Sequence, residues 1–254
     1  MLLATASMGI AAACGDDVDG VRVACACGDL VVSDTILQAT DPVVSEPCTA
    51  DGLLLAAPAG SDGITLDLAG LSIVGRGRGA GIRVARGGRL GCVVVGGGEG
   101  DERAEILAFA TGIHAMGSHE LRELRAIDVH DNRLDGLRIR SSGVRIVDVR
   151  ADANGGNGVF VSGHGNELAD VAADGNAGDG VHVRGSDSTV GAATSGNRRN
   201  GTTILGRRQR VKRVVSSANA RAGVVVAGTD EDPGTIDSTG NGGADAWGRS
   251  GPLQ

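Results

Sequence analysis

The chain has 254 residues and a formal net charge of −7, which argues against a general nucleic-acid-binding protein, because such proteins usually carry a basic surface. Aromatic residues make up only 1%, with no tyrosine, so the core must be built from Val, Ile, Leu and Ala. The 44 glycines lack a Gly-X-Y period and accompany only five prolines, which excludes collagen and disorder and indicates many tight turns between short strands.

The N-terminal segment has the features of an export signal. Residues 2–13 are apolar but too short to span a membrane, which takes about 20 residues. Small residues precede Cys14, as in the lipobox of bacterial lipoproteins, although the first basic residue is Arg22. We expect residues 1–24 to form a signal and tether, with Cys14 lipidated as the only membrane anchor. An ordinary secretory signal, or no signal, is the alternative.

The remaining cysteines are Cys25, Cys27, Cys48 and Cys92. An even number in an exported chain suggests two disulfides. A Cys27–Cys48 bridge would staple the first coil, which leaves Cys25 and Cys92 as the second pair. Alternatively, Cys92 is a buried small hydrophobe in its apolar run. No CxxC pair or Cys/His cluster has zinc spacing, so the sequence predicts no metal site and no cofactor.

After a cap and first strand over residues 25–62, a Gly-apolar-x-apolar pattern recurs along the chain. Its copies begin at Gly81, Gly112, Gly136, Gly158, Gly180, Gly201 and Gly223. An acidic and basic loop at 96–105 interrupts the series, and the later copies are 21 or 22 residues apart. Alternation with period two indicates strands, and coils this short bury an apolar face only by stacking. The sequence therefore predicts an all-β fold: residues 63–243 form a single right-handed parallel β-helix of about 22-residue coils, and 244–254 a polar tail.

An Asn lies four residues before each Gly of the regular part. The series is Asn132, Asn154, Asn176, Asn197, Asn219 and Asn241. Asn and Gly adopt φ > 0 at the lowest cost in a turn, and stacked Asn amides can hydrogen-bond along a column. We predict a structural Asn ladder with no catalytic role. Eight residues before each Asn lies an apolar column, which in the 21-residue coil falls on Thr189, beside Val190.

The pattern resembles a known superfamily. The opening stretch, with Cys27-Gly28-Asp29-Leu30, Pro47-Cys48 and Ile64-Thr65-Leu66-Asp67-Leu68, is similar to that of exported bacterial members of the pectin-lyase-like right-handed parallel β-helix proteins. The resemblance covers residues 25–243 and is specific for the fold. It is unspecific for activity, since members include polysaccharide lyases, hydrolases, epimerases and phage tailspikes, and a fold does not give a function.

The middle residue of each Gly-apolar-x-apolar segment should point outward. This column and the one two residues later supply the candidate ligand face, which comprises Arg138, Arg140, His182, Arg184 and His114. Arg suits the carboxylate or sulfate groups of an acidic polymer, and His182 could act as a base if its surroundings tune it. The column contains no carboxylate. Asp135 and Asp179, at turns two coils apart, would lie about 10 Å apart as a weak acid pair, or serve only as turn residues. A solvated face without a ligand is the alternative.

Two further motifs are weaker functional signals. The basic run Arg207, Arg208, Arg210, Lys212 and Arg213 is interpreted as a solvated edge rather than an anion site. The glycines from Gly75 to Gly81 open a strand, not a helix, so they do not have the structural context of a dinucleotide-binding loop.

We expect an exported, lipid-anchored protein of the bacterial envelope, or a secreted one, that presents a rigid surface to an acidic polysaccharide or an envelope partner. The alternative function is a remote polysaccharide lyase or hydrolase that acts on an acidic polysaccharide.

Overall fold

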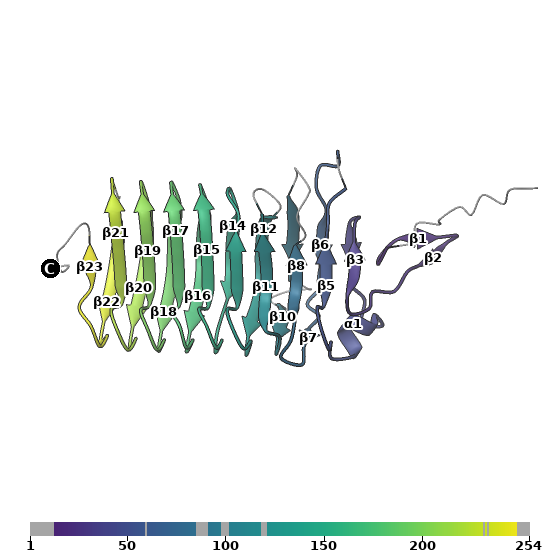
Figure 1. The fold of residues 1–254 in the computed structure, drawn as a ribbon, viewed down its shortest axis with the longest axis horizontal. Helices are drawn as coiled ribbons and strands as arrows, with labels where there is room; N and C mark the ends of the chain where they lie inside the picture. The colour runs from purple at the N-terminus through teal and green to yellow at the C-terminus, as the bar shows by residue number, and fades with distance from the viewer. Residues whose placement is uncertain are drawn as a thin grey trace, which may run out of the picture.

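The computed structural model describes residues 13–58, 60–84, 91–97, 102–117, 121–230, 232 and 234–247. Most of the predicted signal segment, part of the predicted loop at 96–105 and the last residues of the predicted tail lie outside the described residues. Within them the chain winds into a parallel β-helix, as predicted, whose coils stack along one long axis (Figure 1). The strands of successive coils form two long sheets in which every pairing is parallel.

The first sheet, called the ten-stranded sheet below, carries the Gly-apolar-x-apolar segments. From the N-terminal end it comprises β3 (Asp29–Val31), β5 (Leu53–Leu55), β8 (Ala80–Val84), β11 (Thr111–Met116), β13 (Leu137–Arg140), β15 (Val159–His164), β17 (Val181–Ser186), β19 (Thr202–Arg207), β21 (Val224–Thr229) and β23 (Ala246–Trp247). Its last strand therefore lies inside the segment that was predicted to be a polar tail.

The second sheet, called the eleven-stranded sheet, carries the other half of each coil. It comprises β4 (Thr35–Ile36), β6 (Thr65–Asp67), β9 (Cys92–Val95), β12 (Leu121–His130), β14 (Arg145–Arg150), β16 (Glu167–Asp174), β18 (Thr189–Ser195), β20 (Arg210–Ser217) and β22 (Thr235–Thr239). In addition, β10 (Ala104–Leu107) pairs with β12, and β7 (Ile73–Val74) pairs with β10. The long strands β12, β14 and β16 bend in the middle at a residue with φ near +50°, namely Ala126, Asp148 and Asp170.

The core is a stack of aliphatic columns, because side chains that alternate inward in one coil meet those of the next. Leu137, Val159 and Val181 are in register and fully buried, and Thr202 continues the column. Burying one such aliphatic side chain contributes about 1.5–3 kcal/mol relative to an exposed one. In the 21-residue coil the core position opposite Leu168 is occupied by Val190, not by Thr189 as predicted, since the missing residue lies after Val190.

The predicted Asn ladder is present, and we call it the inner Asn ladder (Asn132, Asn154, Asn176, Asn197, Asn219 and Asn241). The Oδ1 atom of Asn176 accepts the backbone N–H of Asn154 at 2.9 Å and its side-chain N–H at 3.1 Å. The Asn176 amide in turn donates to Oδ1 of Asn197 at 3.0 Å and to the Ala151 carbonyl at 2.9 Å. One detail of the prediction is wrong: the left-handed residue is the one before each Asn, for example Gly175 with φ +66°.

The N-terminal end carries the short helix α1 (Pro42–Ser45) and the hairpin of β1 (Asp17–Val18) and β2 (Val21–Arg22), which projects away from the coils (Figure 1). The fully buried carboxylate of Asp41 holds this end together: it accepts two hydrogen bonds from the Arg22 guanidinium and one from the backbone N–H of Cys25. Burial alone would raise the pKa of Asp41, but the bonds from Arg22 and the backbone more than offset this and lower it.

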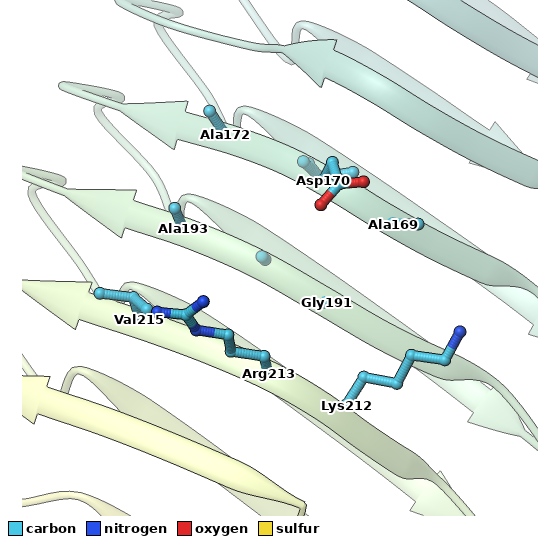
Figure 2. A pocket seen from close by; sticks show the side chains of 10 residues that line it. Ala169, Asp170, Ala172, Gly191, Ala193, Lys212, Arg213 and Val215 are labelled. Carbon is cyan, nitrogen blue, oxygen red and sulfur yellow. The ribbon is translucent and has the colours of Figure 1, made fainter.

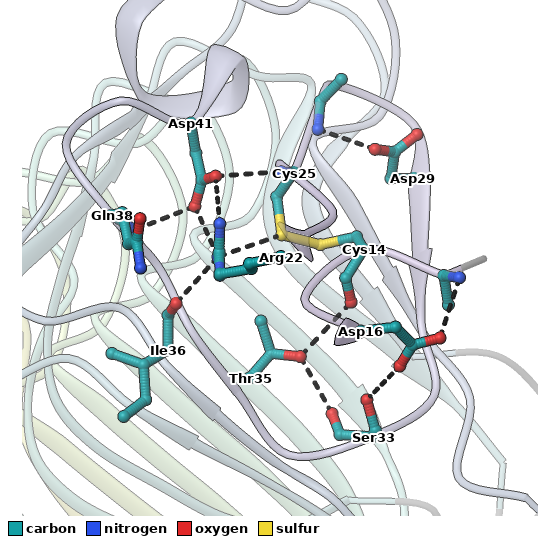
Figure 3. The surroundings of a disulfide bond; sticks show 12 residues. Cys14, Asp16, Arg22, Cys25, Asp29, Ser33, Thr35, Ile36, Gln38 and Asp41 are labelled. Carbon is teal, nitrogen blue, oxygen red and sulfur yellow. Dashed lines mark hydrogen bonds and ion pairs between the residues drawn. A yellow bond between two sulfur atoms is a disulfide. The ribbon is translucent and has the colours of Figure 1, made fainter. Parts of the chain in front are cut away.

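Two disulfides fasten this end. Cys27–Cys48 is confirmed. Cys25, however, pairs with Cys14 (Figure 3). It does not pair with Cys92, which is a buried residue of β9. A sulfur atom in a disulfide cannot carry a thioether-linked lipid, so the structure disagrees with the predicted lipidation of Cys14. Because disulfides persist in oxidising compartments, the two bridges indicate an extracellular or exported protein. In the part of the chain that the structure describes, no helix is long and apolar enough to cross a membrane.

Candidate ligand-binding face

The candidate face is the outer surface of the ten-stranded sheet. Register places the outward residues of five consecutive coils side by side, in the order Arg83, His114, Arg138, Phe160 and His182. Parallel pairing sets neighbouring members about 4.8 Å apart along the axis. The predicted outward column therefore exists as one straight row on a rigid sheet.

Three members of the row form a stack. The guanidinium carbon of Arg138 lies 5.4 Å from the centre of the Phe160 ring, which is the geometry of a cation–π contact. On the other side, the Phe160 and His182 rings are stacked with centroids 5.4 Å apart and an angle of 26° between their planes. The stack restrains three side chains, so they offer a preformed surface rather than mobile groups.

A second polar column runs along the coils, three residues before this row in the sequence, and it was not predicted. We call it the outer Asx ladder (Asp135, Asn157, Asp179 and Asn200). In each step one side-chain oxygen accepts the backbone N–H of the next member, at 2.8, 2.9 and 3.1 Å. Asp135 and Asp179 are 4% and 2% exposed and belong to this ladder, so they are not an acid pair facing a substrate. The signal was the recurrence of Asp or Asn three residues after each of the first four ladder Asn residues.

The carboxylates of this ladder use their second oxygen to hold the row. Oδ2 of Asp135 accepts a bond from Arg138 at 2.6 Å, and Oδ2 of Asp179 lies 2.9 Å from Nδ1 of His182. Burial alone would raise the pKa of Asp179, but the bonds from His182, the Asn200 amide and Thr203 lower it. The ionised carboxylate can only accept, so His182 carries a proton on Nδ1 and, when neutral, has its lone pair on Nε2.

His114 has the opposite arrangement. Its Nδ1 lies 3.0 Å from the Arg83 guanidinium, which donates two bonds to Asp51. Burial and the positive charges of Arg83 and Arg138 lower the pKa of His114, although Asp51 opposes them. Because a guanidinium can only donate, neutral His114 accepts at Nδ1 and carries its proton on Nε2. The row therefore holds two histidines with different tautomers.

The neighbouring outward column holds the two exposed arginines of the prediction. Arg140, Ser162 and Arg184 are in register, so the arginines lie two coils, or about 10 Å, apart. Arg138 is neutralised by Asp135, whereas no ion pair to Arg140 or Arg184 occurs among the described residues. These two side chains give the face its uncompensated positive charge.

Three members of the basic run after Gly206 have acidic partners. Arg208 pairs with Asp187 at 2.6 Å, Arg210 with Asp232 at 3.5 Å, and Lys212 with Glu167 at 3.4 Å. The Arg208 guanidinium and the Ser186 hydroxyl lower the pKa of Asp187 to about 2.

The residues that the structure describes contain no group of three or more His, Cys, Asp or Glu side chains placed to hold a metal ion. The fold defines the class of this chain as a parallel β-helix protein of about nine turns. Comparisons with protein-family models, with curated proteins and with solved structures found no match.

Proposed function

We propose that the outer surface of the ten-stranded sheet binds an acidic polysaccharide along the axis of the solenoid. The observation that carries the proposal is the pair Arg140 and Arg184, exposed and about 10 Å apart beside the Arg138–Phe160–His182 stack. Guanidinium groups bind carboxylates with two parallel hydrogen bonds. The repeat of the coils suits a polymer with regularly spaced charges.

The rest of the surface supports the choice of this face. The outer side of the eleven-stranded sheet is also rich in charge, but several of its basic side chains pair with acidic ones, as Arg145 does with Glu123 and Glu167. An anionic polymer would have to displace these acidic partners. On the ten-stranded sheet it meets two guanidiniums that no described acidic side chain occupies.

Retention of the full chain on immobilised pectate and alginate tests the proposal. The variant Arg140→Ala/Arg184→Ala should elute at a much lower salt concentration than the wild type, because its two uncompensated charges are gone. Arg138 is the poorer target, since its charge is already matched by Asp135. The variant Arg145→Ala/Arg150→Ala removes the same charge from the other sheet and should elute like the wild type. The proposal fails if the wild type is not retained, or if both double variants elute together.

A second candidate, an eliminating polysaccharide lyase, is favoured by one observation: the Asp179 bond directs the Nε2 lone pair of His182 away from the ladder. In elimination, a base takes the proton next to the uronate carboxylate, a carbon–carbon double bond forms, and the glycosidic oxygen leaves with the bonding electrons. Hydrolysis by paired carboxylates is not favoured, since Asp135 and Asp179 accept backbone bonds. His182→Gln should stop any release of unsaturated sugars and preserve retention. Equal release from wild type and variant would eliminate this candidate.

A further inference from the structure

The eleven-stranded sheet contains a one-residue deletion in the coil that runs from Asn176 to Asn197. Register pairs Leu168 with Val190 and Val171 with Ala192, so one residue, Gly191, faces two residues of the coil before it. The next coil again has two, because Val190 pairs with Val211 and Gly191 with Arg213. Neither β18 nor β20 has the left-handed bend that Asp170 makes in β16.

The deletion leaves an open hollow, called the notch below, with a volume of about 620 Å³. Its floor consists of small residues from two coils, chiefly Gly191, Ala192 and Ala193, with Ala169 and Ala172 beside them (Figure 2). Floor and rim come from three successive strands, β16, β18 and β20, which hold one another in register. The notch is consequently part of the rigid solenoid and not of a loop.

The two rims carry opposite charges. Asp170 stands exposed on the rim formed by β16, and Lys212 and Arg213 stand exposed on the rim formed by β20, two coils or about 10 Å along the axis (Figure 2). Lys212 lies 3.4 Å from Glu167, but no ion pair to Asp170 or Arg213 occurs among the described residues. A ligand with charges at both ends would satisfy both rims.

Packing does not require a glycine in the floor. A Cβ atom at Gly191 would meet its nearest neighbours, the carbonyl oxygens of Leu168 and Arg213, at 3.5 and 3.7 Å, which is ordinary contact, and its φ is not positive. At Gly185, by contrast, a Cβ would lie 1.7 Å from a backbone oxygen. A larger side chain at 191 would therefore fill the notch without disturbing the coils, which makes the site testable.

We propose that the notch binds a short peptide with both termini free, its ammonium group at Asp170 and its carboxylate at Arg213. An extended dipeptide spans about 7 Å, and one hydrogen bond of about 2.9 Å at each end brings the total to about 13 Å. The two strands are about 10 Å apart, and the long, exposed Arg213 side chain can lean outward over the remaining distance. Small side chains such as those of alanine suit the alanine and glycine floor. The site is on the other sheet from the polysaccharide face and is independent of the function proposed for it.

Calorimetric titration of the full chain with dialanine tests this site. Binding should be detected in the millimolar range or tighter, and the diblocked N-acetyl-dialanine amide should not bind, because it lacks both charges. Asp170→Asn and Arg213→Gln should each weaken binding about tenfold or more, the typical effect of losing a bond to a charged group. Gly191→Leu should abolish binding and leave the melting temperature and the retention on pectate unchanged.

Matched controls are Asp62→Asn and Arg221→Gln, which change exposed charges outside the notch and should bind like the wild type. The proposal is overturned if dialanine does not bind, if the blocked peptide binds equally well, or if Gly191→Leu retains binding. It is also overturned if sedimentation shows a dimer that Gly191→Leu dissociates, because the notch would then be an interface between two copies.

Discussion

The inner Asn ladder and the outer Asx ladder lie three residues apart in the four coils that contain both. Both satisfy turn amides, but with different chemistry. The inner ladder uses only amides, which both donate and accept, so each side chain bonds above, below and to a carbonyl. The outer ladder replaces alternate amides by Asp135 and Asp179, whose second oxygens point at Arg138 and His182. A ladder made only of amides has a structural role alone, whereas a ladder that includes carboxylates also orients surface side chains.

The largest expected effect on stability comes from a substitution that breaks the inner Asn ladder. Asn176→Leu removes the acceptor of the Asn154 backbone and side-chain N–H groups and the donor to the Ala151 carbonyl. Each buried group left unpaired costs about 1–3 kcal/mol, so we expect a loss of about 3 kcal/mol or more in the free energy of unfolding. Backbone strain does not add to it, since Gly175 carries the positive φ.

A denaturant melt measures this loss, and Arg150→Ala, an exposed control, should stay within about 0.5 kcal/mol of the wild type. Because each coil contacts only its neighbours, the damage should spread to the adjoining coils and show as faster hydrogen exchange there. An Asn176→Leu variant that melts with the wild type would mean that the inner ladder does not stabilise the fold.

An intermediate effect is expected at the outer ladder, where two substitutions of one residue separate its two roles. Asp179→Ala removes the acceptor of the Asn200 backbone N–H and should cost about 1–3 kcal/mol. Asp179→Asn keeps that acceptor and should cost less, but it removes the negative charge beside His182. The nitrogen chemical shifts of the His182 ring should then report a loss of the Nδ1-protonated form. If the ring is unchanged in Asp179→Asn, the carboxylate does not set the tautomer.

The pH dependence of the stability follows from the direction in which folding shifts the pKa of Asp179. Because folding lowers the pKa of Asp179, its contribution to stability is present above the pKa of an unfolded aspartate and is lost as the pH falls through the lower folded pKa. Asp179→Asn should therefore lose less stability than the wild type when both are melted at increasingly acid pH. A wild-type loss that the variant reproduces would assign the acid sensitivity to other carboxylates.

The smallest effect concerns a third column, in which two carboxylates are stacked without an amide between them. Burial raises the pKa of both Asp152 and Asp174, the Asp174 and Ser195 backbone amides partly oppose this, and nearby carboxylates raise it further. A raised folded pKa favours the protonated form, so these groups stabilise the fold at low pH and lose that contribution as the pH rises through the folded pKa. In the outer Asx ladder, by contrast, Asn157 lies between Asp135 and Asp179, so these two carboxylates are not stacked directly on each other.

Asp152→Asn should accordingly raise the melting temperature slightly at neutral pH, since its Oδ1 can still accept the Asp174 backbone N–H. The gain should shrink as the pH falls through the raised folded pKa of Asp152 towards the ordinary pKa of a carboxyl group. A variant that is less stable than the wild type at neutral pH would show that the charge of Asp152 makes a favourable contact.

The sequence alone determined the coil, the two sets of core columns and the inner Asn ladder, because a repeat of 22 residues is local information that each coil restates. It also placed Arg138, Arg140, His182 and Arg184 on one face, since alternation assigns every strand residue to a side. Cys27–Cys48 followed from its position across the first coil. These features are set within a single coil and recur along the chain.

Only the tertiary structure decided how neighbouring coils use their side chains. The bond of Asp179 to His182 rather than to a substrate, the pairing of Cys14 with Cys25, and the notch over Gly191 depend on register between coils and on the closure of the N-terminal end. A single missing residue looks like a small irregularity in the sequence. In the stack it becomes a hollow with charged rims, because the strands on either side keep their full length and cannot close over it.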